Sequence, residues 1–255
     1  MIKFHILNGD CLYSHLSETS IQGEYIICRE CLIEGDLRGE NFMEFMNYRA
    51  EYISQTYGTA KDDYFLKTVS EFEKIINLPI ECEVNLWFEN DLFCQTNMWF
   101  IINLISERNS GNVVNRIFPV IKDKNDVWKG FGNSDSYDLE LAFSNKIKFN
   151  EEDINLGNEL WKAYKNGDNK KLTEISNSTE DSKCFHHLKE VCKANADKAY
   201  RTEKTIKEIL NNENSDFKNL FSEFCKREGI YGYGDLQVKR IYDKVMAVVH
   251  KKFKI

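Results

Sequence analysis

Short apolar runs alternate with helical patterns along the first half of the chain. Runs bounded by turn residues predict strands at 4–7, 24–31, 83–88 and 113–121. Apolar residues at helical spacing predict helices at 11–16, 42–57, 62–76 and 91–107. Because strands and helices alternate, we expect residues 1–122 to form an α/β domain with a Rossmann-like, mostly parallel sheet.

The pattern changes in the second half. Residues 123–150 are polar and contain two close glycines, which predicts a hinge or loop region. From 151 to 255 strand patterns end, and helical spacing predicts an all-helical domain with helices at 154–165, 170–175, 185–196, 202–210, 217–227 and 236–253. The last three have the outline of a helix-turn-helix unit, with Gln237, Arg240 and Lys244 exposed on the final helix.

Composition indicates a folded protein. Of the 255 residues, 42% are hydrophobic and 13% aromatic, which is more than disordered chains carry. No apolar run reaches the roughly 18 residues that a membrane helix needs, and the first residues do not resemble an export segment. The eight cysteines stand mostly in apolar runs and lack the spacing of a disulfide framework. Cys28 and Cys31 have Cys-x-x-Cys spacing, but on the predicted strand they face opposite sides and no second pair exists, so zinc is not expected. We therefore expect a soluble, cytoplasmic protein with reduced thiols and no membrane contact.

Charge is unevenly distributed. Residues 1–112 hold 8 Lys and Arg against 18 Asp and Glu, whereas the net charge of the whole chain is only −7. An acidic N-terminal part repels the phosphates of nucleic acid, while the basic C-terminal helix attracts them. A solvated basic helix face is the other interpretation of that end of the chain.

Polar residues follow three of the predicted strands where each strand ends. Asn8-Gly9-Asp10 follows the first strand, Arg29-Glu30 the second and Glu89-Asn90-Asp91 the third. Ligands of open parallel sheets bind beyond the carboxyl ends of the strands, so we expect these ends to converge on one crevice. Gln95 lies one turn after Asp91, and Arg49 falls on the apolar stripe of its helix and should point inward.

Four carboxylates are the candidate catalytic residues, namely Asp10, Glu30, Glu89 and Asp91. They can hold a Mg²⁺ ion or divide the roles of acid and base between them. The candidate substrate-binding residues are Asn8, Gly9, Arg29, Arg49 and Gln95. Gly9 would admit a ligand close to the backbone, and the arginines would clamp an anionic substrate. No residue is assigned as a dedicated metal ligand, and the cofactor is left open, Mg²⁺ included. The alternative is a buried ionic network of these groups that only stabilises the fold.

Three blocks of this sequence resemble the bacterial domain of unknown function 1835 family (DUF1835). They are His-Ile-Leu-Asn-Gly-Asp at 5–10, Arg-Glu-Cys-Leu-Ile-Glu-Gly at 29–35 and Leu-Trp-Phe-Glu-Asn-Asp-Leu-Phe-Cys-Gln at 86–95. The resemblance covers roughly residues 1–120, and segments 160–164 and 231–235 look like the helical part that accompanies this domain. The family implies no established activity. Its relatives often carry a bulkier His or Tyr at the position of Asn90, so Asn90 receives no catalytic role.

Two function classes follow from these observations. In the first, the crevice is an active site for hydrolysis or transfer on a phosphorylated or nucleotide-like small molecule. In the second, the protein is a non-enzymatic ligand sensor or adaptor whose helical domain contacts nucleic acid or a protein partner. The sequence leaves the reaction, the substrate and the oligomeric state open.

Overall fold

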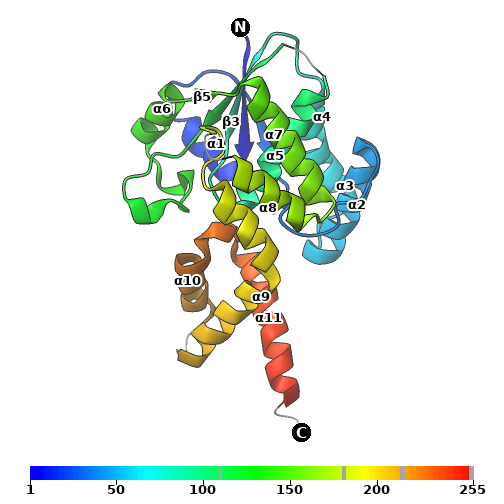
Figure 1. Cartoon of the computed structure of the whole chain (residues 1–255), viewed down its shortest axis with the longest axis vertical. Coiled ribbons are helices and arrows are strands. Elements are labelled where there is room, and N and C mark those ends of the chain that lie inside the picture. Colours follow the sequence, from blue (N-terminus) through cyan, green and yellow to red (C-terminus); the bar gives the residue numbers. More distant parts are fainter. Residues whose placement is uncertain (109–110, 180–181, 213–215, 253–255) are drawn as a thin grey trace.

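The computed structural model describes residues 1–108, 111–179, 182–212 and 216–252 (Figure 1). The strands are β1 (Lys3–Asn8), β2 (Glu24–Cys28), β3 (Glu83–Trp87), β4 (Val113–Ile117) and β5 (Ile147–Lys148). The α-helices are α1 (Asp10–Leu16), α2 (Phe42–Tyr57), α3 (Lys61–Tyr64), α4 (Ser70–Ile76), α5 (Leu92–Ser106), α6 (Ser136–Ser144), α7 (Glu151–Lys165), α8 (Asn169–Ser178), α9 (Leu188–Asn212), α10 (Phe217–Glu228) and α11 (Asp235–Lys252). A π-helical turn, η1 (Phe65–Val69), joins α3 to α4, and the 3₁₀ turns are η2 (Lys124–Asp126), η3 (Phe131–Asn133) and η4 (Gly229–Tyr231).

The sheet has the strand order β2-β1-β3-β4-β5. The first four strands are parallel, and β5 runs antiparallel to β4 at the edge. The expected α/β class with a mostly parallel sheet is therefore confirmed. The register places Asn8 opposite Cys28 and Leu7 opposite Trp87, so β1, β2 and β3 end at one edge of the sheet.

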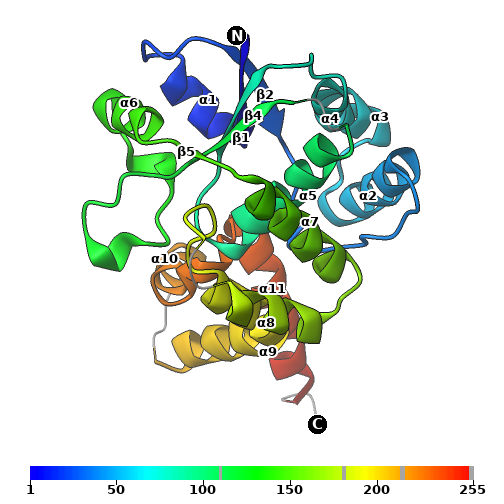
Figure 2. The same ribbon diagram turned by 45° about the horizontal axis from the view of Figure 1, so that its top comes forward.

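Helices cover both faces of this sheet. Leu7, Trp87 and Ile117 pack on one face with side chains of α1 and α6. Ile6 and Leu86 point to the other face, into the core formed by α2, α4 and α5. Burial on both faces explains why the strands read as continuous apolar runs. Figure 2 shows α1 and α6 on one side of the strands and α2, α4 and α5 on the other.

The connections leave β1 and β3 in opposite directions. The chain passes from β1 through α1 on one face to β2, then crosses back to β3 and continues into α5 on the other face. Between neighbouring strands whose connections diverge in this way, a crevice opens at the carboxyl edge, and it is the usual ligand position in open α/β sheets. In this protein that position lies between the ends of β1 and β3.

The helices after residue 150 are packed partly into the same core. Helix α7 lies on α5, and the main cluster of buried residues continues to Tyr231. A separate small cluster joins the end of α9 to α10 and α11 at the end of the molecule opposite the N-terminus (Figure 1). No strand occurs from 151 onward among the described residues. The division into domains at 1–122, 123–150 and 151–255 stays a prediction.

Two local predictions differ from the structure. The predicted loop region 123–150 contains α6 and β5 as well as two 3₁₀ turns. Helix α9 is continuous over 25 residues, where two helices were expected. The residues at 197–201 include no proline or glycine, so nothing in the sequence stops the helix there.

Several structural expectations can be checked directly. All eight cysteines are free thiols. His5 is fully buried, accepts a hydrogen bond from Trp87 Nε1–H (3.1 Å) and pairs with Gln22 O (3.3 Å), so both ring nitrogens are used within the core. Within the described ranges, no helix combines the length and apolar character needed to cross a membrane.

Candidate functional site

A cleft of about 740 Å³ opens beyond the carboxyl ends of β1 and β3. Its base carries Asn8 from β1, Glu89 and Asp91 after β3, and Cys94 in the first turn of α5. One side is the segment 128–130, and the facing wall comes from α10 and the turn after it. The wall residues are Lys218, Phe221, Ser222, Phe224, Cys225, Lys226, Glu228, Gly229, Gly232 and Tyr233.

Glu89 is the half-buried carboxylate of this cleft. Its Oε2 accepts a hydrogen bond from the Cys94 thiol (2.8 Å), and its Oε1 accepts one from the Phe131 N–H (3.2 Å). The neighbouring Gly130 lies so close that an added Cβ would stand 2.2 Å from Glu89 Oε1. The loop that carries Gly130 and Phe131 can therefore approach the Glu89 carboxylate this closely only because residue 130 has no side chain.

Asp91 is the second carboxylate, and it is 4% exposed. It caps α5, where its side chain accepts a hydrogen bond from the Cys94 N–H (2.9 Å). Burial, together with the nearby charge of Glu89, raises the pKa of Asp91 to about 7. Gly232, at a φ of +63°, covers Asp91 so closely that a Cβ there would stand 2.1 Å from Oδ1.

A buried arginine lies behind the two carboxylates. Arg116 of β4 is 1% exposed, donates from Nη2 to Glu89 O (3.0 Å) and contacts the Met98 sulfur through Nη1. Burial lowers the pKa of Arg116 to about 10, and the charges that act against this include those of Glu89 and Asp91. Its guanidinium forms no ion pair with any described carboxylate. Its positive charge therefore acts on Glu89 and Asp91 from a distance, and it stabilises their ionised forms electrostatically.

Cys94 and Asn97 are polar members of the site that sequence analysis missed. Asn8 Nδ2–H donates to Cys94 Sγ (3.0 Å), and Asn97 Nδ2–H donates to Asn8 Oδ1 (2.8 Å). Both residues stand in the strongly apolar helix α5, so Cys94 was interpreted as a small hydrophobe. For Cys94 a signal was available in its position, because it lies in the first turn of the helix that follows β3, and ligands of open α/β sheets bind beyond the strand ends.

The predicted pair Glu30 and Arg49 occupies a different place. Arg49 Nη2 lies 2.7 Å from Glu30 Oε2, and both side chains are fully buried. Tyr64 also donates to Glu30, and Arg49 Nη1 donates to the carbonyls of Glu34 (2.8 Å) and Asp36 (3.2 Å). Neither Glu30 nor Arg49 lines the cleft. This geometry is that of an ionic network tying α2 to the loop after β2.

Asp10 and Arg29 form an ion pair near the surface. Arg29 donates from Nε and Nη2 to the Asp10 carboxylate, with a shortest distance of 2.7 Å, and the Asp10 side chain is 62% exposed. The bond from Arg29 keeps the pKa of Asp10 below its usual value. Asp10 is the first residue of α1 and not its cap, a position that Gly9 takes with a φ of +93°.

Gln95 ties two segments of the core together. Its Nε2 donates to Asn90 O (2.8 Å) and to His186 O (3.0 Å), and the side chain is 1% exposed. Of the nine predicted site residues, Asn8, Glu89 and Asp91 line the strand-end cleft, and the others occupy the positions given above. The roles assigned to all nine stay predictions.

The cleft offers a limited set of metal donors. Glu89, Asp91 and Cys94 each present one ligand atom, and these atoms lie within 4.8 Å of one another. Mg²⁺ prefers about six oxygen ligands, and a thiol is not among the donors it favours. The donors that are present therefore fit a Mg²⁺ ion poorly unless a ligand's phosphate oxygens and water complete the shell.

Comparisons with protein families, curated proteins and solved structures found no match to this chain. The resemblance to the DUF1835 family therefore stays a prediction. Function has to be argued from the geometry of the cleft.

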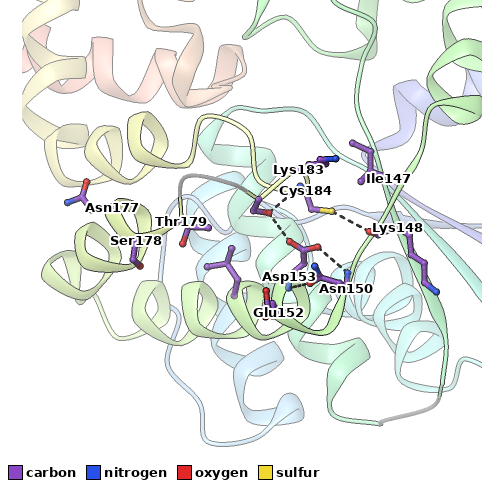
Figure 3. Close-up of a pocket in the computed structure, with 12 residues that line it drawn as sticks. Ile147, Lys148, Asn150, Glu152, Asp153, Asn177, Ser178, Thr179, Lys183 and Cys184 are labelled. Atoms are coloured by element: carbon purple, nitrogen blue, oxygen red, sulfur yellow. Dashed lines mark hydrogen bonds between the residues drawn. The ribbon is translucent and has the colours of Figure 1, made fainter.

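A second hollow, of about 750 Å³, lies where α7 begins (Figure 3). Three of its polar side chains are used for local structure: Asn150 and Asp153 form a reciprocal capping box, and Ser182 Oγ–H donates to Asp153 Oδ1 (2.8 Å). These bonds satisfy the first turn of α7, so the groups are not directed at a ligand. The strand-end cleft remains the better candidate.

The basic residues of α11 are engaged within the chain. Arg240 Nη1 lies 3.0 Å from Glu34 Oε1 and donates to the hydroxyls of Tyr52 and Tyr57. Lys244 pairs with Glu203 (2.5 Å), and Gln237 Oε1 accepts the Gly234 N–H. A recognition helix presents such side chains to a groove, whereas here they fasten α11 to its neighbours. Nucleic-acid binding through α11 stays a prediction.

Proposed function

We propose that the strand-end cleft is an active site for hydrolysis or transfer on a phosphorylated, nucleotide-like small molecule. One observation carries the proposal. Glu89, a carboxylate held by two hydrogen bonds, opens into a cleft between β1 and β3, the point of the sheet where the connections diverge. Open α/β sheets bind their ligands at this point.

The lining of the cleft suits a nucleotide. Half-buried aromatic rings offer stacking faces for a base, and exposed lysines at the rim attract phosphate. The rings belong to Phe93, Trp128, Phe221 and Tyr233. The lysines are Lys218, Lys129, which also pairs with Asp126 (2.9 Å), and Lys226, which also lies 3.6 Å from Glu223. Asn8 and Glu89 at the base supply the polar contacts that fix orientation.

Glu89 and Asp91 divide the proton-transfer roles. Glu89 accepts the proton of an attacking water or hydroxyl while the new bond to oxygen forms. Asp91, with its pKa raised to about 7, is the group that can return a proton to the leaving oxygen. Two neighbouring carboxyls in different surroundings are the usual basis for such a division. A Mg²⁺ ion carried by the phosphates would add charge stabilisation.

A thermal-shift screen tests binding. Nucleotides, nucleosides and sugar phosphates are added at 1 mM, each with and without Mg²⁺. A ligand at a concentration of about 100 times its Kd raises the free energy of unfolding by about 2.7 kcal/mol. For a chain of this length this corresponds to a rise of roughly 5–10 °C in Tm. The absence of a shift across the whole set, in both conditions, would contradict the proposal.

Matched variants place the ligand in the cleft. Lys218→Ala should reduce the shift by roughly 2–4 °C, because one exposed charge contact is worth about 1 kcal/mol at most. Lys193→Ala, at an exposed lysine of α9 outside the cleft, should leave the shift unchanged. Glu89→Gln should keep the shift but abolish turnover, measured as product formation by liquid chromatography. A shift without turnover in the wild type would favour the non-enzymatic sensor over the enzyme.

The finer structural expectations are part of this proposal. The order of the first four strands, their parallel direction and the helices on both faces support a Rossmann-like sheet. The small cluster of α9, α10 and α11 supports a helical C-terminal domain. We retain membership of the bacterial DUF1835 family and a cytoplasmic location as parts of the same hypothesis.

A further inference from the structure

We propose that Cys94 is a positioning residue that aims Glu89 through its thiol, and that Asn8 and Asn97 hold the thiol in place. The inference rests on the proposed role of Glu89 in the cleft. It assigns a function to three residues that sequence analysis gave either no role or, for Asn8, only a substrate contact.

The four side chains form one continuous chain of hydrogen bonds. Asn97 Nδ2 lies 2.8 Å from Asn8 Oδ1, Asn8 Nδ2 lies 3.0 Å from Cys94 Sγ, and Cys94 Sγ lies 2.8 Å from Glu89 Oε2. Asn97 is fully buried, and Cys94 is 5% exposed. The chain runs from beneath the sheet edge to the carboxylate that opens into the cleft.

The backbone fixes the direction of the two bonds that the asparagines donate. The Leu32 N–H can only donate, and it lies 3.1 Å from Asn97 Oδ1, so this oxygen is the acceptor. Asn97 Nδ2 therefore donates to Asn8 Oδ1 and to Glu30 O (2.7 Å). Asn8 must then present its Nδ2 to the sulfur. The sulfur accepts that bond, so the thiol proton remains available for donation, and Glu89 Oε2 lies 2.8 Å away as its acceptor.

The surroundings of Cys94 favour the protonated thiol. Burial and the neighbouring carboxylates, Asp91 and Glu89, raise the pKa of Cys94 well above its ordinary value. A reactive cysteine needs the opposite, a positive environment that stabilises the thiolate. The same geometry that makes the thiol a poor nucleophile makes it a stable donor. Together with the Phe131 N–H, it restricts Glu89 to one position.

Infrared spectroscopy of the S–H stretch tests this geometry without a ligand. The difference spectrum of wild type minus Cys94→Ala isolates the Cys94 band from those of the other seven thiols. We expect the Cys94 band at a lower frequency than the others, because a carboxylate is a strong acceptor. Glu89→Gln should move it to higher frequency. A Cys94 band that coincides with the other thiols, or ignores Glu89→Gln, would overturn the proposal.

The supporting asparagines have a matched control on the same helix. Asn97→Ala should shift or broaden the Cys94 band, because Asn97 no longer fixes which atom of the Asn8 amide donates to the Cys94 sulfur. Asn103→Ala, also on α5 but bonded to Asn158, should leave the band unchanged. If Asn97→Ala does not fold, the wild-type and Glu89→Gln spectra still decide whether the thiol donates to Glu89.

Turnover separates positioning from nucleophilic attack. For any nucleotide that the wild type converts, Cys94→Ser keeps a donor to Glu89 and should retain kcat within about threefold. Cys94→Ala should lower kcat about 10- to 100-fold at a similar KM, the scale expected when a catalytic group is misplaced by about 1 Å. Equal losses in both variants would contradict a positioning role. If no nucleotide is bound or converted, the proposed function fails, while the infrared result still decides the geometry.

Discussion

Gly130→Ala is the sharpest single test of the site, because it moves Glu89 without touching its chemistry. An alanine Cβ at this position would stand 2.2 Å from Glu89 Oε1 and 2.4 Å from its Cγ. Ordinary contact requires about 3.5 Å, so the carboxylate must retreat by roughly 1.3 Å. The backbone of residue 130, at φ −87° and ψ −153°, has a negative φ, so alanine meets no left-handed backbone penalty there.

The expected loss of folding stability in Gly130→Ala follows from the two hydrogen bonds that Glu89 loses. Retreat breaks the contacts with the Cys94 thiol and the Phe131 N–H, now 2.8 and 3.2 Å long. Each such bond is worth about 0.5–1.5 kcal/mol net, and water replaces part of it at a half-buried carboxylate. We expect a loss of about 1–2 kcal/mol, or roughly 2–8 °C in Tm. Turnover should fall about 100-fold, because the displacement exceeds 1 Å.

Gly132→Ala is the matched control two residues away. A Cβ at Gly132 meets no atom within 4 Å, and the residue lies in η3. Gly132→Ala lowers the conformational entropy of the unfolded chain as much as Gly130→Ala does, so the Tm of this variant should equal that of the wild type or be slightly higher. In a Glu89→Asp background the shorter side chain leaves room, and the cost of Gly130→Ala should shrink by at least about 0.5 kcal/mol. Equal Tm values for the two alanine variants, with turnover retained in both, would refute the described geometry.

Three further predictions concern the rest of the molecule. Glu30→Gln should cost about 3–5 kcal/mol in urea unfolding, because it leaves a buried guanidinium unpaired, whereas Asp10→Asn, at an exposed ion pair, should cost under about 1 kcal/mol. Burial lowers the pKa of His5 from 6.5 to about 4, so the unfolded chain binds a proton that the folded one does not, and His5 alone contributes a loss of about 3 kcal/mol as pH falls from 6.5 to 4. Asp91, with its pKa raised to about 7, contributes in the opposite direction over this range, so the His5 contribution is measured as the difference between the pH dependences of wild type and His5→Gln. Because Arg240 and Lys244 are already paired within the chain, we expect no salt-dependent retention on duplex DNA; retention that disappears in Arg240→Ala and Lys244→Ala would show otherwise.

Local patterns predicted most of the fold. Apolar runs and helical spacing located β1 to β4 and α5, and they placed Arg49 on the inward face of α2, where it is fully buried. These features depend on the spacing of apolar residues over short stretches of the chain, and this spacing can be read from the sequence. The two-residue strand β5 was missed, because it is defined only by its pairing with Arg116 and Asn115 across the sheet edge.

The candidate site was predicted less completely, since strand ends alone do not determine which carboxylates meet. Glu30 and Glu89 both follow buried strands, yet Glu30 turns toward Arg49 while Glu89 opens into the cleft. The difference comes from the partner that each side chain finds. Arg49 belongs to a helix about twenty residues later, whereas the backbone donor at Phe131 follows a loop that the sequence marked only as polar.

Asp91 shows why neither the sheet region nor the C-terminal helical region forms the site alone. At the start of α5 it caps the helix, and the bond from the Cys94 N–H by itself would favour the ionised carboxylate. Gly232, 141 positions later, closes over Oδ1 at a spacing that only glycine permits. The resulting burial, with Glu89 beside it, raises the pKa of Asp91 to about 7. The acid of the proposed pair is therefore created by long-range packing, in a cleft whose base comes from the sheet and whose wall comes from α10.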